Sequence, residues 1–514
     1  MRTPGVDITD LLPTPTRRWL GLVCLTTALL IIGLDVTVLT IALPTLATTV
    51  GASTAELQWI TNAFTLPFAA LLLPSTALGT RGRKQLLMAG VALFAAGSAI
   101  ALQADSSADL IASRALMGVG AAATVPHALS LAPSLASPAD REGAATLASA
   151  GFALGLPLGP VVGGCLLAAF GWHAIFVVNV VVMLAALAGI ALAVHEPGQG
   201  RVEPVDAVST VLVLTGTAAL AYAVTEATTR GWAHPVTLPV FLAGAALLSA
   251  MVIRLIRTHS PLADAALWRD PRFTWAICTL SLITLILLAL LFMLPQYLQQ
   301  VQGYDAWATG LRLMPMMAGL ALGTVAGKRL ATVVDVKWTL VLGMLLWSVG
   351  LLWIGQLSHG SSYPVAAGAL VTTGLALGFT LPTALHALTG SLPPEKAVTA
   401  HALANTCRQI AAALGFAVMG GVLNATYRRE LREDAPVGLA DGVVDEARQS
   451  IAVAAEAAAA LPAREGEALV TLAQHAFVTG MTTTARIGAF VTALLAVLLM
   501  VCMPTIRREK PGAS

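Results

Sequence analysis

Long apolar stretches without charged residues recur along this chain and constrain its fold more than any other feature. The stretch "ITLILLALLFML" covers residues 283–294, twelve residues with no charge. A helix rises about 1.5 Å per residue, so about 20 apolar residues cross about 30 Å of hydrocarbon. Lipid offers no hydrogen bonds, which leaves helices and closed barrels as spanning structures. Barrel strands of about 10 alternating residues do not occur in the sequence. It therefore predicts an all-α integral membrane protein.

The composition agrees with this class of protein. Hydrophobic residues make up 57% of the 514 residues and charged residues only 11%, and the mean hydropathy is +0.81. So few polar residues cannot cover a soluble body of this size. The net charge of +2 comes from basic residues spread along the chain, which argues against nucleic-acid binding.

Charged residues and Pro/Gly breaks divide the chain into fourteen predicted spans. They lie near residues 19–44, 57–79, 85–103, 110–133, 143–168, 174–194, 207–226, 237–257, 273–298, 308–327, 338–357, 364–390, 398–425 and 477–503. Basic residues of the short connections gather on one side of these spans, whereas the opposite short loops hold only Arg230. Because cytoplasmic loops are enriched in Lys and Arg, both termini are predicted to be cytoplasmic.

Several kinds of chemistry lack the motifs that they need. The five cysteines all lie in apolar segments, at spacings that suit neither a disulfide framework nor a zinc site. The sequence has no phosphate-binding G-x-x-x-x-G-K-[ST] loop, no HExxH and no GxSxG, and its loops are too short for a soluble catalytic domain. We therefore expect no enzyme, no metal site and no cofactor.

A single acid lies inside the first predicted span. Asp35, in "GLDVTVLTIALP" (33–44), precedes Pro44 by nine residues and thus lies about 13 Å below the outer end of the span. A charge at this depth costs about 2.5–3.5 kcal/mol on insertion scales. Burial disfavours the ionised carboxylate and a nearby cation favours it, so a group under both influences exchanges protons near neutral pH. The alternative is a purely structural aspartate bonded to Thr37 or a neighbouring helix.

Arg114, in "LIASRALMGVGAAA" (110–123), is the predicted partner of Asp35. It lies about 6 Å below the outer end of its span, and its long side chain bridges most of the remaining axial distance. An ion pair would explain how lipid tolerates both charges. The alternative is that Arg114 extends to the outer headgroups.

The fifth predicted span reads "GFALGLPLGPVVGG" (151–164). Its glycines at every fourth position form one slanted face that another backbone can approach closely. Pro157 and Pro160 each remove a backbone donor, which permits bending.

These motifs, with "LQWITNAFTLPFAALLLPS" (57–75), "LPQYLQQVQGYDAWATGLRLMPMMAG" (294–319) and "NTCRQIAAALGFAVMGG" (405–421), resemble the fourteen-span drug:proton antiporter family of the major facilitator superfamily. The resemblance implies that Asp35 belongs to a proton and cation site and Arg114 to the proton relay. It also implies an antiporter signature made of Gly151, Gly155, Gly159, Pro160, Gly163 and Gly164.

The same resemblance implies the fold and the location. We expect six-helix bundles at residues 1–200 and 261–514, with two additional helices at 201–260, in a bacterial plasma membrane. The protein would work as a monomer that uses the proton gradient. The long connection 426–476 would lie outside, with short helices near 439–460 and 463–476 split by Pro462, or as a disordered linker.

The sequence departs from the family in two places. The loop after the second span has Gly79 and Thr80 where the family has an aspartate. This puts a conformational latch in doubt, although the basic loop motif remains: Arg81, Gly82, Arg83 and Lys84. The other departure is Met117, in place of a glutamine after Arg114.

Polar residues of other spans carry weaker predictions. The second half has Arg408 near the middle of a span, with Asn405 and Gln409 beside it. Glu226, at the end of the seventh span, is a further candidate for proton coupling, or it is merely solvated. Histidines in such helices are more often packed and neutral than proton carriers: His127, His386 and His401. The sequence indicates no role for Arg312.

The predicted substrate is a lipophilic cation. Asp35 would attract its charge, and apolar and aromatic side chains would form the walls: Trp59, Phe64, Phe68, Met293 and Tyr297. Each of these could instead pack against lipid. We expect proton-coupled efflux of cationic drugs, dyes or antiseptics. The alternatives are a dedicated exporter of one endogenous antibiotic or metabolite, and a nontransporting scaffold or sensor, against which Asp35 and the glycine face argue.

Overall fold

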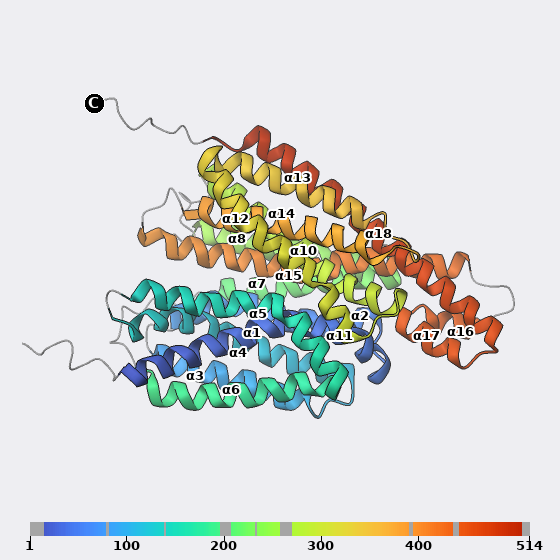
Figure 1. The fold of residues 1–514 in the computed structure, drawn as a ribbon, viewed down its shortest axis with the longest axis horizontal. Helices are drawn as coiled ribbons and strands as arrows, with labels where there is room; N and C mark the ends of the chain where they lie inside the picture. The colour runs from blue at the N-terminus through green and yellow to red at the C-terminus, as the bar shows by residue number, and fades with distance from the viewer. Residues whose placement is uncertain are drawn as a thin grey trace, which may run out of the picture. The chain divides into compact units, whose positions relative to one another are not determined.

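The computed structural model describes residues 15–78, 82–137, 140–195, 207–231, 234–257, 270–389, 394–434 and 441–505 (Figure 1). Within these ranges the regular structure is helical throughout. The chain divides into two compact units: residues Met1–Ala42 with Trp59–Leu214, and residues Leu43–Gln58 with Thr215–Ser514.

The first unit contains most of the helices of the N-terminal half. They are α1 (Pro15–Thr49) as far as Ala42, α2 (Thr54–Leu78) from Trp59 on, α3 (Arg83–Ala101), α4 (Ser107–Leu131), the 3₁₀ turn η2 (Ala132–Leu135), α5 (Arg141–Phe170), α6 (His173–Ala193) and the start of α7 (Ala207–Arg230).

The second unit contains the remaining helices and the short segment 43–58. After the rest of α7 come α8 (Thr237–Arg257), α10 (Pro271–Gln296), the π-helical turn η4 (Tyr297–Val301), α11 (Ala306–Arg312), α12 (Met314–Val333), α13 (Val336–Ile354), α14 (Tyr363–Thr389), α15 (Pro394–Glu433), α16 (Asp441–Ala447), α17 (Ile451–Ala459) and α18 (Ala463–Cys502).

Eleven of the described helices are long and apolar enough to cross a membrane. The number rises to twelve if the two parts of α5, Gly143–Leu156 and Leu158–Phe170, inclined at 53°, count as one span. Each of the fourteen predicted spans overlaps a helix. The tenth is broken between α11 and α12, at Leu313, because Pro315 in the first turn of α12 has no N–H to donate back along the chain.

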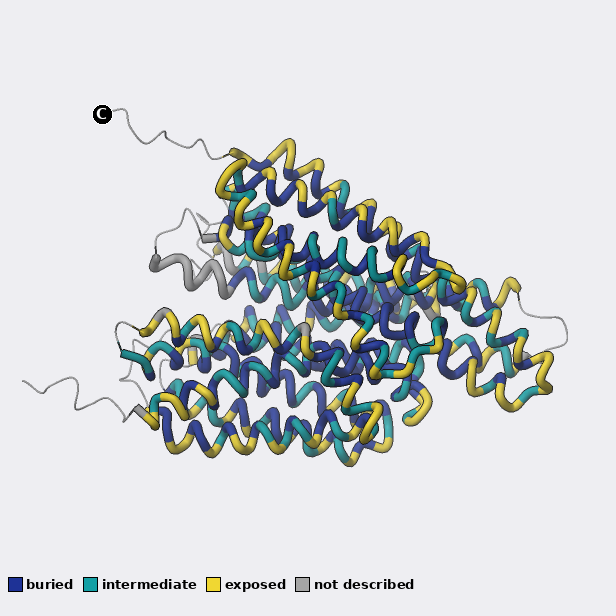
Figure 2. The backbone as a smooth tube through the Cα atoms, in the orientation of Figure 1, coloured by how far each residue is buried: buried dark blue, intermediate teal, exposed yellow. Residues whose placement is uncertain are grey.

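Exposed residues follow the outer faces of several helices (Figure 2), and many of them are large and apolar. On α6 the exposed residues Val177, Val181, Leu184 and Leu192 recur at helical spacing, and Phe490, Leu494 and Val501 do so on α18. Water would not tolerate such continuous apolar faces, whereas hydrocarbon does. The protein is a multi-pass membrane protein.

The short helices between α15 and α18 are tied to the second unit. The Tyr427 hydroxyl of α15 donates to the carbonyl of Ala447 at 2.9 Å, and the Thr54 hydroxyl donates to the carbonyl of Gln449 at 2.7 Å. The separate helix predicted at 463–476 is wrong, because this stretch is the first part of α18. Pro462 directly precedes that helix, and the sequence of α18 contains no proline that would interrupt it.

Candidate functional site

Asp35 lies at the meeting point of three helices in the first unit. Its side chain is buried in α1 and is 1% exposed. Arg114 of α4 donates from Nη1 to Asp35 Oδ2, and Asn179 of α6 donates from Nδ2 to Oδ1 at 2.9 Å. Both carboxylate oxygens therefore accept a hydrogen bond, one of them from a cation, which is how a buried ionised acid becomes tolerable.

Arg114 is enclosed as fully as the acid it contacts. It is 2% exposed, and its guanidinium carbon lies 4.6 Å from the centre of the Phe64 ring on α2. Nη1 also lies 3.8 Å from the sulfur of Met117, a weak acceptor at the position that departs from the family. Nε has no partner among the described residues. In that part of the chain, Arg114 thus relies on Asp35 as its one charged partner.

Asn179 was not among the residues predicted from the sequence. It is a lone amide within the apolar run of α6 and is 4% exposed. An uncharged amide at membrane depth is a weak signal, because such groups also hydrogen-bond for packing alone. Its hydrogen bond to Asp35 nevertheless places it in this site.

Replacing Asn179 by leucine, which has a similar volume, is expected to destabilise the purified protein. A hydrogen bond to a charged group contributes about 1.5–3 kcal/mol, so the thermal unfolding midpoint in detergent should fall. Val181→Leu on the exposed face of the same helix serves as the control and should leave it in place. An unchanged midpoint for Asn179→Leu would show that the bond contributes nothing.

The glycine face of α5 packs against α1, the helix that carries Asp35. A Cβ added at Gly155 would lie under 3.0 Å from the backbone of Leu30 and Leu34, and one added at Gly151 would approach the Thr26 carbonyl equally closely. Only glycine permits this approach, because it has no Cβ. These glycines thus fix the distance between α5 and α1.

Pro160 and Gly159 have separate roles at this contact. Pro160 has no N–H, so the carbonyl four residues earlier, that of Leu156, loses its helical donor. The Thr37 hydroxyl on α1 donates to that carbonyl at 2.8 Å. A Cβ at Gly159 would collide with the Thr37 hydroxyl. Proline frees the acceptor and glycine gives the donor room, while Thr37 itself makes no bond to Asp35.

The other predicted residues of the first unit lie in varied surroundings. Phe64 and Phe68 are buried with ring centres 5.8 Å apart, whereas Trp59 is only half-buried. Lys84, in the first turn of α3, donates to the Ala191 carbonyl near the end of α6 at 2.9 Å, where the helix dipole favours a cation. Arg81 lies outside the described residues.

His127 of α4 is buried and contacts the Ser75 hydroxyl at 3.1 Å through Nε2, which fits a packed histidine. In the second unit His386 is exposed, and the side chain of His401 lies outside the described residues.

Three predicted residues of the second unit make contacts within that unit. Glu226 forms an ion pair with Arg230, one turn further along α7. The Tyr297 hydroxyl donates to the Ser358 carbonyl at 2.9 Å. The structure shows what Arg312 contacts. Its guanidinium carbon lies 3.7 Å from the centre of the Tyr304 ring and 5.2 Å from that of Tyr363. It therefore holds the break between α11 and α12 against the start of α14.

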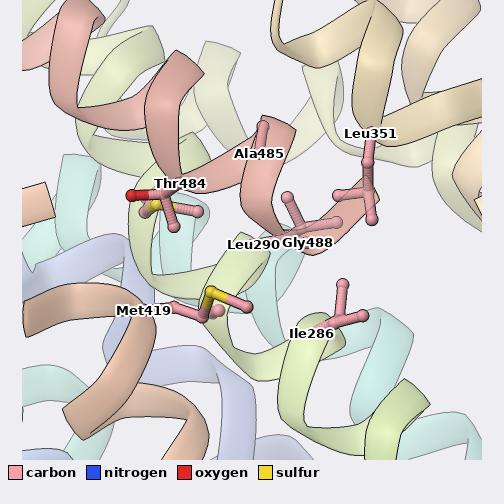
Figure 3. A pocket seen from close by; sticks show the side chains of 9 residues that line it. Ile286, Leu290, Leu351, Met419, Thr484, Ala485 and Gly488 are labelled. Carbon is pink, nitrogen blue, oxygen red and sulfur yellow. The ribbon is translucent and has the colours of Figure 1, made fainter. Parts of the chain in front are cut away.

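A small apolar hollow lies inside the second unit (Figure 3). Its wall includes Met293 and Ile286 of α10, Leu351 of α13, Met419 of α15 and Thr484 of α18. Its free volume of about 10 Å³ is far below the roughly 300–1,000 Å³ of pockets that enclose drug-sized ligands. Met293 thus lines a gap between packed helices in this conformation.

Comparisons with known proteins agree with this architecture. The model of the Major Facilitator Superfamily matches residues 25–416. "Multidrug efflux pump LfrA" of Mycolicibacterium smegmatis is 34% identical over 93% of this chain and 94% of its own. "Methyl viologen resistance protein SmvA" of Salmonella typhimurium is 29% identical over 90% and 93%.

Among solved structures, a bacterial homologue of the human lysosomal transporter Spinster, in an inward-facing and occupied conformation, superposes with a TM-score of 0.69. Its sequence identity is 18%, over 95% of this chain and 98% of that one, so it supports the fold alone. This chain belongs to the Major Facilitator Superfamily, as a transporter of the multidrug-resistance type and not an enzyme.

Proposed function

We propose that this protein is a proton-coupled antiporter that exports lipophilic cations, such as drugs, dyes or antiseptics, across the bacterial plasma membrane. The observation that carries the proposal is the buried Asp35 carboxylate held between Arg114 and Asn179. A buried acid is the one group in this site whose charge a proton can remove. The similarity to LfrA and SmvA supports drug-like substrates.

The contacts of Asp35 suggest how a proton would change the protein. In the ionised form, Asp35 and Arg114 neutralise each other. Protonation of the carboxylate leaves Arg114 as a buried cation without its counter-charge, and an uncompensated buried charge costs about 3–5 kcal/mol. A conformation that gives Arg114 other partners or exposes it to water then becomes favoured. Release of the proton on the other side reverses the preference, as alternating access requires.

The arrangement of spans is part of the proposal. All fourteen predicted spans would cross the membrane, with α7 and α8 as the two additional helices and both termini in the cytoplasm. The segment 441–459 would then lie outside. Phe64 and Phe68, within the same unit as Asp35, would supply aromatic surface for a cation, and Glu226 would act as a second acid. A monomer suffices for this mechanism.

Reconstituted full-length protein tests the proposal directly. Ethidium transport into proteoliposomes is followed by fluorescence, with a proton gradient that is acidic inside the vesicles. Transport against the dye gradient should appear only while the proton gradient lasts, and nigericin should abolish it. Accumulation that survives collapse of the gradient would refute proton coupling, and a gradient that moves no dye would refute broad cation export in favour of a dedicated substrate.

A further inference from the structure

Arg408 of α15 lies beside the middle of a membrane span in the second unit. Its Nε donates to the Thr284 hydroxyl at 3.2 Å. Thr284 stands at the centre of α10, thirteen residues after Pro271 and twelve before Gln296, so about 18–20 Å of helix extends on either side. The guanidinium is therefore near the middle of the hydrocarbon layer. The hydrocarbon layer is about 30 Å thick, so the lipid headgroups on either side lie about 15 Å away, beyond the reach of the arginine side chain.

The sequence around Arg408 contains few acidic side chains that could neutralise this charge. Between residues 271 and 429 the sequence contains only Asp305, Asp335 and Glu395. Asp305 and Asp335 accept bonds from the first turns of α11 and α13, at the ends of those helices. Glu395 precedes Arg408 by thirteen residues of α15, about 20 Å along the helix axis. The carboxylate that Arg408 needs is therefore absent from this stretch of the chain.

Among the described residues, the structure provides a hydrogen-bond partner for Nε of Arg408 but none for its two terminal nitrogens. The Thr284 hydroxyl uses its own proton on the Leu280 carbonyl at 2.7 Å, so it can only accept from Nε. Among the described residues, Thr284 is the one hydrogen-bond partner of Arg408, and the arginine is half-buried. The two terminal nitrogens, with four N–H donors, have no hydrogen-bond partner in the part of the chain that the structure describes.

Arg486, an exposed arginine at another position in the same unit, shows the contrast. Arg486 of α18 donates from Nε and Nη2 to the Gly355 carbonyl, at 3.1 and 2.8 Å. That carbonyl belongs to the end of α13, where the helix dipole also favours a cation. Arg486 thus has a carbonyl partner for a terminal nitrogen, whereas Arg408 has none among the residues that the structure describes.

We propose that Arg408 binds a carboxylate of the transported molecule. The terminal nitrogens of a guanidinium match the two oxygens of a carboxylate, and such a pair is strongest away from water. The substrates would then include amphipathic zwitterions and acids as well as simple cations. This inference deepens the proposed function and rests on it, because it names a second chemical class for the same transporter.

Two dyes that differ only in a carboxylate provide the test. Rhodamine B carries a free carboxylate, and rhodamine B ethyl ester does not. Equilibrium binding of each dye to the full-length protein in detergent is measured by fluorescence anisotropy. Arg408→Gln should weaken binding of the acid at least about tenfold, whereas binding of the ester should change less than about twofold. Arg408→Lys, which keeps the charge but loses the paired donors, should give an intermediate loss.

The controls distinguish a carboxylate site from a structural arginine and from a site for an inorganic anion. Arg486→Gln should alter binding of both dyes equally little, and retained ester binding by Arg408→Gln shows that the variant is folded. An equal change for both dyes, or no change for the acid, would overturn the inference. Replacement of chloride by methanesulfonate at equal ionic strength should have no effect, since a chloride-dependent change would mean that Arg408 holds an inorganic anion instead. The binding measurement uses no proton gradient, so its result can be interpreted even if the protein shows no proton-driven efflux.

Discussion

Asp35→Asn is expected to abolish proton-driven dye accumulation. Asparagine keeps the size of the side chain and an acceptor for Arg114 but has no proton to exchange. A tenfold loss requires only about 1.4 kcal/mol of lost coupling free energy, and we expect the loss of the initial rate to exceed that. The measurement is ethidium accumulation in proteoliposomes under an imposed proton gradient, for native and variant protein at equal reconstituted amounts.

A paired substitution separates coupling from stability. Asp35→Asn leaves Arg114 as a buried charge without a counter-charge, so the thermal unfolding midpoint should fall as well. Asp35→Asn combined with Arg114→Gln should recover much of the midpoint, because removal of both charges costs less than removal of one. The double variant should remain inactive in proton-driven transport. Accumulation by Asp35→Asn at the native rate would remove Asp35 from the mechanism.

Gly155→Ala is expected to have the second large effect. The added methyl group would lie under 3.0 Å from backbone atoms of Leu30 and Leu34, and backbone atoms cannot rotate away as side chains do. Overpacking of this kind costs about 1–3 kcal/mol. It also displaces α1, so both the thermal unfolding midpoint and proton-driven transport should fall.

A matched control for this substitution exists on the same helix. Nothing lies within 4 Å of a Cβ added at Gly143 of α5, and alanine favours a helix over glycine by about 0.5–1 kcal/mol. Gly143→Ala should therefore leave transport intact and the midpoint unchanged or slightly higher. Equal behaviour of the two variants would show that the glycine face does not set the distance between α5 and α1.

The helices were predictable from the sequence because each apolar run is long enough to cross a membrane and ends at charges or at Pro/Gly. The contact of Asp35 with Arg114 was predictable for a related reason, since lipid tolerates few charges and the arginine side chain is long enough to bridge most of the axial distance between the two residues. By contrast, the glycine spacing on α5 indicates a close neighbour without indicating which helix it is. That α1 is the neighbour depends on tertiary packing.

Other features could not be derived from local sequence. Asn179 is separated from Asp35 by 144 positions, and a lone amide carries no information about its partner. The hydrogen bond from Thr37 to Leu156 arises only because Pro160 removes a donor on a different helix. The continuous helix from Ala463 onward was mistaken for two, because the polar character of residues 463–476 suggested a separate surface segment.

The bend in α5 is linked to the position of the Asp35 carboxylate. The carbonyl of Leu156, next to the bend, is hydrogen-bonded to Thr37, only two residues from Asp35 on the same helical turn. A change of angle in α5 would therefore move the Asp35 carboxylate relative to Arg114 and Asn179. Such coupling is reciprocal, so a change in the contacts of the carboxylate would in turn favour one curvature of α5 over another.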